Sequence, residues 1–268
     1  MSIEISVLLP TRGRTTALSD SIMTLVDNTT NPETVEYLLA FDNDDIESYQ
    51  WFQENIADKI DQAGSSYTCL GFEPMGYIRL NEYVNHLAKV AKGRWLFFSN
   101  DDAIMHSSGW DAVIADKKEF AVLRIPTHNQ HPYAIFPIVP KEWYTLFGYL
   151  SPHQINDAWI SQVGYMLDIV VNIPLEVTHD RHDLTGNNKD ETFQSRIMLE
   201  GNHYDPRDFN YVTWRKRRMR DAAVIAQYLK SQGRDISWFE NVLNKRQDPW
   251  EKMTGPEYDP NKQLAILK

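Results

Sequence analysis

The sequence has a single cysteine, Cys69, and no long apolar run. One cysteine excludes an intramolecular disulfide and fits a reducing compartment. No stretch approaches the ~20 apolar residues of a transmembrane helix. The apolar run at Ile3–Leu9 is too short for a signal peptide, and no positive charge precedes it. We therefore expect a cytoplasmic protein without a membrane span.

An excess of positive charge is also lacking. The chain has 27 Lys and Arg against 37 Asp and Glu, a formal net charge of -10. The field of the whole molecule therefore does not favour non-specific adhesion to nucleic acid or anionic lipid, and such a partner would need a local basic patch. With 268 residues, 42% of them hydrophobic, the chain can bury the core of one large domain, with or without a smaller appendage.

What the sequence does have is an alternation of apolar runs and helical patterns. The runs are typical of buried strands, and they lie at Ile3–Leu9, Val35–Phe41, Tyr67–Phe72 and Trp95–Phe98. Between them, apolar residues recur at helical spacing in Ala17–Val26, Ile46–Ile60 and Tyr77–Lys92. This order predicts an α/β fold with a mainly parallel sheet flanked by helices. Such sheets bind ligands at the carboxyl ends of their strands.

Polar residues follow three of these strands where the chain leaves the sheet. Pro10–Arg14 is a basic loop before a helix, which suits a phosphate but is equally typical of a solvated turn. Asp42 follows the second strand, and Asp101 and Asp102 follow the fourth. Adjacent carboxylates serve one site only if the chain turns there; they would then suit Mg²⁺ or Mn²⁺ carrying a diphosphate. The alternative is an acidic loop that caps the next helix.

The order of these motifs carries a family resemblance. A P-T-R-G-R loop, an acidic end to strand two, an R-x-N helix and the run F-F-S-N-D-D together resemble the GT-A glycosyltransferases, closest to family 2, over about the first 110 residues. The resemblance implies a nucleotide-sugar transferase using a UDP- or GDP-sugar. The donor contacts that it implies are Pro10, Thr11, Arg12, Arg14, Asp42, Arg79, Asn81 and Asn100.

The resemblance also implies a divalent cation. The family motif usually reads L-D-x-D-D, whereas this sequence has Ser99 at the first acid. That departure leaves Asp101 as the first choice of metal ligand and Asp102 as the second. Several metal-dependent enzymes of this fold place a histidine after a late strand, which His179 or His182 would match as a ligand for Mn²⁺ or Mg²⁺.

A further acid opens a predicted amphipathic helix in the second half of the chain. Asp157 matches the second position of the acid pair that family 2 enzymes place there, and Asn156 replaces the first. The resemblance implies that Asp157 is the base that deprotonates the acceptor hydroxyl, with inversion at the anomeric carbon. Helix capping is its alternative role. The polar stretch 184–192 is interpreted as a loop able to close over the donor.

The last part of the chain differs in composition. We expect a catalytic domain at 1–205, with a donor half at 1–110 and an acceptor half at 111–205, and a helical extension at 206–268. The extension has a basic run that suggests a phosphate-bearing partner or, alternatively, a solvated helix face: Arg215, Lys216, Arg217, Arg218 and Arg220.

Three functions stay open from the sequence. The first is a metal-dependent inverting glycosyltransferase acting on a glycan or on a hydroxylated base in DNA. The second is a nucleotidyltransferase on a similar sheet, although Thr11–Arg14 has one glycine where such enzymes usually have a Gly-rich loop. The third is a non-catalytic nucleic-acid-binding module built on the basic run.

Overall fold

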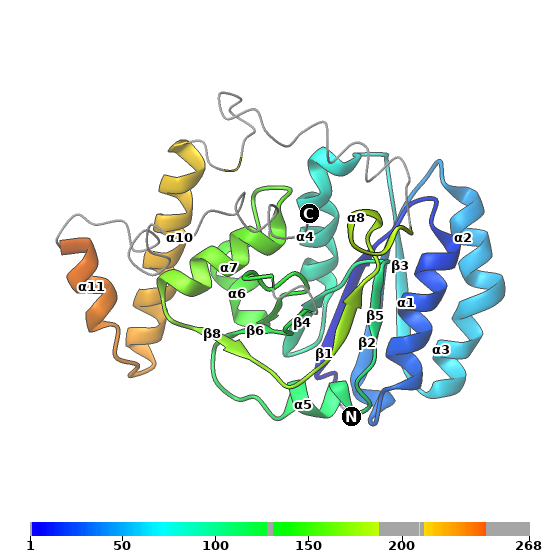
Figure 1. Ribbon diagram of the computed structural model, residues 1–268, viewed down its shortest axis with the longest axis horizontal. Helices are drawn as coiled ribbons and strands as arrows, with labels where there is room; N and C mark the ends of the chain where they lie inside the picture. Colours follow the sequence, from blue (N-terminus) through cyan, green and yellow to red (C-terminus); the bar gives the residue numbers. More distant parts are fainter. Residues whose placement is uncertain (1, 128–130, 188–208, 210–211, 245–268) are drawn as a thin grey trace.

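The alternating apolar runs form one mixed sheet. The computed structural model describes the chain except for residues 1, 128–130, 188–208, 210–211 and 245–268, and Figure 1 shows the arrangement. The sheet has the order β3-β2-β1-β4-β7-β6-β8. Its strands are β1 (Ile5–Pro10), β2 (Val35–Asp42), β3 (Ser66–Phe72), β4 (Trp95–Phe98), β6 (Val122–Arg124), β7 (Ile138–Pro140) and β8 (Val170–Asn172). A separate two-stranded sheet pairs β5 (Ala103–Met105) with β9 (Val177–His179).

The first four strands are mutually parallel, as the sequence predicts. β1 pairs with β2 on one side and with β4 on the other, and β2 pairs with β3. β7 then runs antiparallel to both β4 and β6. In the second half, the sequence also has apolar runs at 134–139 and 169–177, which are typical of strands. The run 134–139 contributes only its last two residues to β7, and the run 169–177 divides between β8 and β9, so these strands were predicted less accurately.

Helices cover both faces of the sheet. The helices of the first half are α1 (Thr15–Asp27), α2 (Ile46–Phe52), the π-helix η2 (Gln53–Ala57), α3 (Asp58–Ala63), α4 (Leu80–Val90) and α5 (Trp110–Ala115), with 3₁₀ turns η1 (Pro32–Thr34) and η3 (Tyr77–Arg79). Those of the second half are α6 (Lys141–Phe147), α7 (Asn156–Met166), α8 (His182–Thr185), α10 (Val212–Ser231) and α11 (Ser237–Asn244). Among the described residues, none of these is long and apolar enough to cross a membrane.

Alternating strand residues divide the core into two layers. In β1, Val7 packs into the layer with α1, α2, α3 and α5, whereas Leu8 packs into the layer with α4, α6, α7 and α10. The same alternation recurs along β2 and β4, as expected for strands buried on both faces. Figure 1 shows α1, α2 and α3 at one end of the molecule and α10 and α11 at the other.

The described part of the C-terminal extension packs on the second half of the chain. α10 lies against α7 and α6, and its buried residues, among them Ile225 and Leu229, share one core layer with Trp159 of α7. The predicted helices there are confirmed as α10 and α11, although residues 245–268 lie outside the described part. Residues 188–192 of the predicted closing loop also lie outside it.

Candidate functional site

The polar loops after β1, β2 and β4 meet at one edge of the sheet. The order of strands reverses between β1 and β4, so the chain leaves these two neighbouring strands toward opposite sides. In open α/β sheets this switch point leaves a crevice outside the carboxyl ends of the strands. Pro10 ends β1 here, and Thr11 Oγ1 donates a hydrogen bond of 2.9 Å to Asp101 Oδ2. The first and fourth strand ends are therefore joined directly.

The chain turns at Asp101 and Asp102, as it must if both carboxylates are to serve one site. Ala103 N donates to Asn100 O at 3.2 Å, which closes a tight turn around Asp101 and Asp102. Arg14 Nη1 lies 2.8 Å from Asp101 Oδ1 and 3.4 Å from Asp102 Oδ2. Asn100 also accepts a hydrogen bond from Ser21 of α1 through its carbonyl oxygen. Both carboxylates thus face one place, because the turn overrides the alternation of an extended chain.

Burial and neighbouring charges shift the pKa values of the two acids in opposite directions. Burial raises the pKa of Asp101 to about 6, against the attraction of Arg14. Burial also opposes ionisation of Asp102, but the neighbouring His179 and the charges of Arg14 and Arg181 hold the pKa of Asp102 below its usual value. Adjacent acids in one crevice therefore differ in how easily they ionise, and Asp102 is the better anion.

The short β5–β9 pair brings His179 to the acids. Ala103 of β5 pairs with His179 of β9, so the histidine lies opposite the residue that comes directly after Asp102. His179 Nε2 lies 3.3 Å from Asp102 Oδ1, and that buried oxygen has no hydrogen-bond partner among the described residues. The alternative ligand, His182, begins α8, and its side chain lies outside the described part.

The donor set at this place fits a divalent cation. Asp102 Oδ1 and His179 Nε2 supply one carboxylate oxygen and one imidazole nitrogen, which suits Mn²⁺ or Mg²⁺ completed by diphosphate oxygens. No group of three or more His, Cys, Asp or Glu side chains is arranged to hold a metal within the described residues. Asp101 is engaged by Thr11 and Arg14 through both oxygens. The geometry therefore favours Asp102 over Asp101, the reverse of the order taken from the sequence.

Asp42 lies at the end of β2 beside the first loop. Its side chain is 4% exposed, and Arg12 Nη1 lies 2.8 Å from its Oδ2. Tyr83 of α4 donates a hydrogen bond to the other carboxylate oxygen. Arg12 also pairs with the exposed Asp44. Two strand ends and one helix therefore hold this carboxylate at the edge where the fold binds its ligand.

Asp157 lies in the first turn of α7 and is half-buried. No side chain caps the amino end of α7, so the capping alternative is not observed. Asn156 is buried, and its Oδ1 has no hydrogen-bond partner among the described residues. Neither residue is therefore used to cap the helix.

His131 is a residue near Asp157 that the sequence did not single out. Tyr133 N donates a hydrogen bond of 3.2 Å to His131 Nδ1, which places the proton of the neutral ring on Nε2. Burial lowers the pKa of His131, and three neighbouring side chains act on it electrostatically: Asp157, Arg181 and His179. His131 therefore lies within electrostatic reach of both Asp157 and His179. Its only signal in the sequence is a histidine in a polar loop before a strand.

Two residues predicted to bind the donor make no contact with the acid pair within the described part of the chain. Arg79 ends η3, directly before α4, where it is exposed and pairs with Glu82 of α4. Asn81 is half-buried in the first turn of α4. No contact joins either residue to the acid pair in the described structure, so their part in donor binding stays a prediction.

The basic run divides into buried and exposed residues. Arg218 is 2% exposed, donates to Phe209 O at 2.9 Å and stacks 4.0 Å from the Phe209 ring centre. Arg218 is therefore not accessible to a polyanion, and the prediction that it contacts one was wrong. Its position on α10 faces the core of the protein. Arg217 is half-buried and lies over the ring of Tyr149. The exposed members are Arg215, Lys216 and Arg220.

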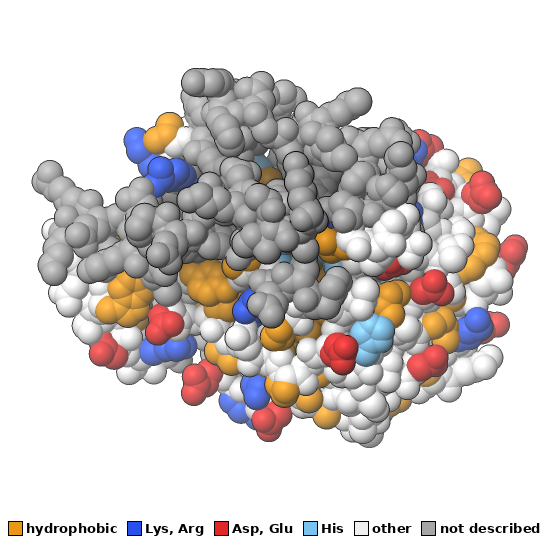
Figure 2. Space-filling model, in the orientation of Figure 1, with side chains coloured by type: hydrophobic (Ala, Val, Ile, Leu, Met, Phe, Trp, Pro, Cys, Tyr) orange, Lys and Arg blue, Asp and Glu red, His pale blue; other side chains and the backbone are white. Residues whose placement is uncertain are grey.

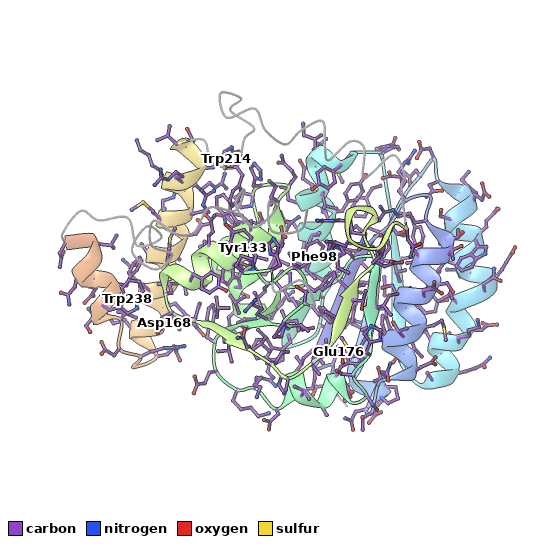
Figure 3. All side chains as sticks on the ribbon, in the orientation of Figure 1. Phe98, Tyr133, Asp168, Glu176, Trp214 and Trp238 are labelled. Carbon is purple, nitrogen blue, oxygen red and sulfur yellow. The ribbon has the colours of Figure 1, made fainter. Side chains whose placement is uncertain are left out.

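Figure 2 shows Lys and Arg side chains together at the upper end of α10. Figure 3 labels Trp214 at the same end of the helix. The exposed basic residues of α10 and Trp214 therefore lie at the same end of this helix.

The sheet order, the switch point and the helices on both faces are those of the GT-A fold, which the chain shares with solved glycosyltransferase structures. Among solved structures, the chain is similar to the mannosyltransferase PcManGT from Pyrobaculum calidifontis in complex with GDP-Man and Mn²⁺. The TM-score is 0.55 at 10% identity, covering 100% of this chain and 84% of that one. It is also similar to S. aureus TarS 1-349 in complex with UDP-GlcNAc, with a TM-score of 0.56 at 13% identity, covering 99% and 79%.

A further S. aureus TarS structure matches with a TM-score of 0.50 at 12% identity, and there the alignment covers 78% of this chain and 44% of the TarS chain. The chain thus spans less than half of that protein. No family model and no curated protein matches the sequence. The likeness establishes the fold.

Proposed function

We propose that this chain is a metal-dependent inverting glycosyltransferase that moves a sugar from a UDP- or GDP-sugar to a hydroxyl acceptor. The observation that carries the proposal is the acid pair at the switch point, where Thr11, Arg14 and His179 converge on Asp101 and Asp102. The fold supports it, since two solved structures that share it are complexes, one with UDP-GlcNAc and one with GDP-Man and Mn²⁺.

The donor lies along the carboxyl ends of β1, β2 and β4 in this proposal. Asp42 and Arg12 hold the nucleoside, and Arg14 reaches the diphosphate, because a guanidinium donates in parallel to phosphate oxygens. Asp102 and His179 would hold the cation, which neutralises charge on the leaving diphosphate when bound. Thr11 fixes the orientation of the neighbouring Asp101 through its hydrogen bond.

The acceptor approaches from the side of α7. Asp157 takes the proton of the acceptor hydroxyl while the hydroxyl oxygen forms a bond to the anomeric carbon. At the same time, the bond between that carbon and the diphosphate oxygen breaks. Attack opposite the leaving group inverts the anomeric centre. The acceptor class is a glycan or a hydroxylated base in DNA, and the exposed basic residues of α10 would favour a polyanionic one.

Product analysis tests the reaction class. The purified chain is incubated with UDP- and GDP-sugars and candidate acceptors, with Mn²⁺ or with EDTA, and the released nucleotide is identified. We expect a nucleoside diphosphate and a dependence on the metal. Release of pyrophosphate would instead favour the nucleotidyltransferase alternative. Absence of both donor binding and turnover, with every donor and with Mn²⁺ present, would overturn the proposal.

A further inference from the structure

Arg14 occupies the centre of the acid pair. Its side chain is 11% exposed, and those of Asp101 and Asp102 are 7% and 6% exposed. The contact with Asp101 is short, at 2.8 Å, whereas the contact with Asp102 is 3.4 Å. The guanidinium therefore holds Asp101 firmly and Asp102 loosely.

Two adjacent buried carboxylates need a neighbouring positive charge. Their repulsion is strong where little water screens it, and a buried charge without a partner is costly. Arg14 supplies that charge from within the chain. A divalent cation held by Asp102 and His179 would supply positive charge to the same carboxylate, so the ion and Arg14 compete electrostatically for it.

The neighbouring arginine shows that this arrangement is specific. Arg12 lies two residues earlier in the same loop, but it pairs with Asp42 and Asp44. Only Arg14 of the two reaches Asp101 and Asp102. The loop after β1 thus assigns one arginine to the acid at the end of β2 and the other to the acid pair after β4.

We propose that Arg14 sets the affinity of this site for a divalent cation by competing with it for Asp102. The inference rests on the proposed function for the existence of the metal site, and adds which residue limits binding. Arg14 contacts Asp102 through Oδ2, at 3.4 Å, whereas the ion would bind Oδ1 beside His179, so the two compete for the charge of one carboxylate and not for one oxygen. Removal of Arg14 therefore strengthens metal binding, although it removes a residue of the donor site.

Binding of Mn²⁺ alone, followed by electron paramagnetic resonance of the free ion, measures this without turnover. We expect Arg14→Gln to bind Mn²⁺ ~10-fold more tightly or better than the wild type, since a competing charge is lost from a buried site. Arg12→Gln is the matched control, because it removes the same charge from the same loop without contacting Asp101 or Asp102. Its Mn²⁺ affinity should stay close to that of the wild type.

Two more variants make the result specific. Adding Asp102→Asn to Arg14→Gln should abolish the gain, because the carboxylate that binds the ion is lost. Arg14→Lys keeps the charge on a compact ammonium that cannot bridge both acids as a guanidinium does, so its affinity should fall between those of wild type and Arg14→Gln. It also keeps the test decisive if Arg14→Gln does not fold.

An unchanged or weaker Mn²⁺ affinity in Arg14→Gln and Arg14→Lys overturns the inference, and so does a gain that Arg12→Gln shares. Failure of every variant to bind Mn²⁺ also overturns it. Product analysis in EDTA then shows separately whether the chain is a transferase that works without a metal.

Discussion

Asp157 shows how a single residue gains a testable role from its surroundings. It lies in the first turn of α7 without capping that helix, and its charge acts on His131. A carboxylate held at a helix start, yet not used as a cap, is suited to accept a proton from a bound hydroxyl.

We expect Asp157→Asn to lower kcat by ~10²–10⁴-fold, because the amide cannot accept the acceptor's proton. Donor binding should not change, because no contact joins Asp157 to the predicted donor residues within the described part of the chain. Calorimetry with a nucleotide-sugar and initial rates measure the two effects. Asp116→Asn is the control, since that side chain, directly after α5, is 81% exposed. Full turnover by Asp157→Asn would remove the base assignment.

At the scale of elements, buried polar side chains stabilise the packing of α10 on α7. Arg218 stacks on Phe209 and lies 5.4 Å from the ring centre of Trp159. Asp221 accepts hydrogen bonds from Tyr149 and from Trp159 Nε1, and burial raises the pKa of this carboxyl. These contacts keep α10 packed on α7, the helix whose first turn contains Asp157.

Arg218→Ala should lower the free energy of unfolding by ~2–4 kcal/mol, because a buried hydrogen bond and the stacking on Phe209 are lost together. Lys216→Ala, an exposed change on the same helix, should shift it by less than ~0.5 kcal/mol. Urea denaturation measures both. Equal stability in the two variants would mean that Arg218 does not brace α10.

The connection from α4 to β4 passes very close to β1. A Cβ atom on Gly93 would lie 2.5 Å from Ser6 N, and Gly93 N donates to Ser6 Oγ at 2.8 Å. Gly93→Ala should therefore cost ~1–3 kcal/mol of unfolding free energy through overpacking. The neighbouring Lys92→Ala serves as the control, because its side chain is exposed. A thermal melt of Gly93→Ala equal to that of Lys92→Ala would contradict this close approach.

For the whole molecule, the acidic surface limits what the basic helix can bind. The formal net charge is -10, and three members of the basic run are exposed: Arg215, Lys216 and Arg220. If each neutralises one phosphate of a duplex, the slope of log affinity against log salt should be roughly -2.7 or shallower. Fluorescence anisotropy of labelled DNA over a salt series measures it. A much steeper slope would show that other surfaces take part, and would revive the nucleic-acid-binding alternative.

The first half of the fold could be predicted because its signals are local. Each of the first four strands is an apolar run that stops at polar residues, and each helix between them has regular spacing. In the second half, β6, β7, β8 and β9 are three-residue strands. Their boundaries depend on which strand they pair with, so periodicity alone placed them poorly.

The sequence by itself determined the α/β class, the acids at the strand ends and the positive loop before α1, because these follow from the order of residues along each strand. Only the tertiary structure decided which oxygen faces which partner. The turn at Asn100–Ala103 brings both acids to Arg14, and the β5–β9 pairing brings His179 to Asp102 across a separation of 77 residues in numbering. Packing of α10 on α7 turned Arg218 from a surface cation into a core residue. Contacts between distant segments depend on how the layers pack, which local residue order does not specify.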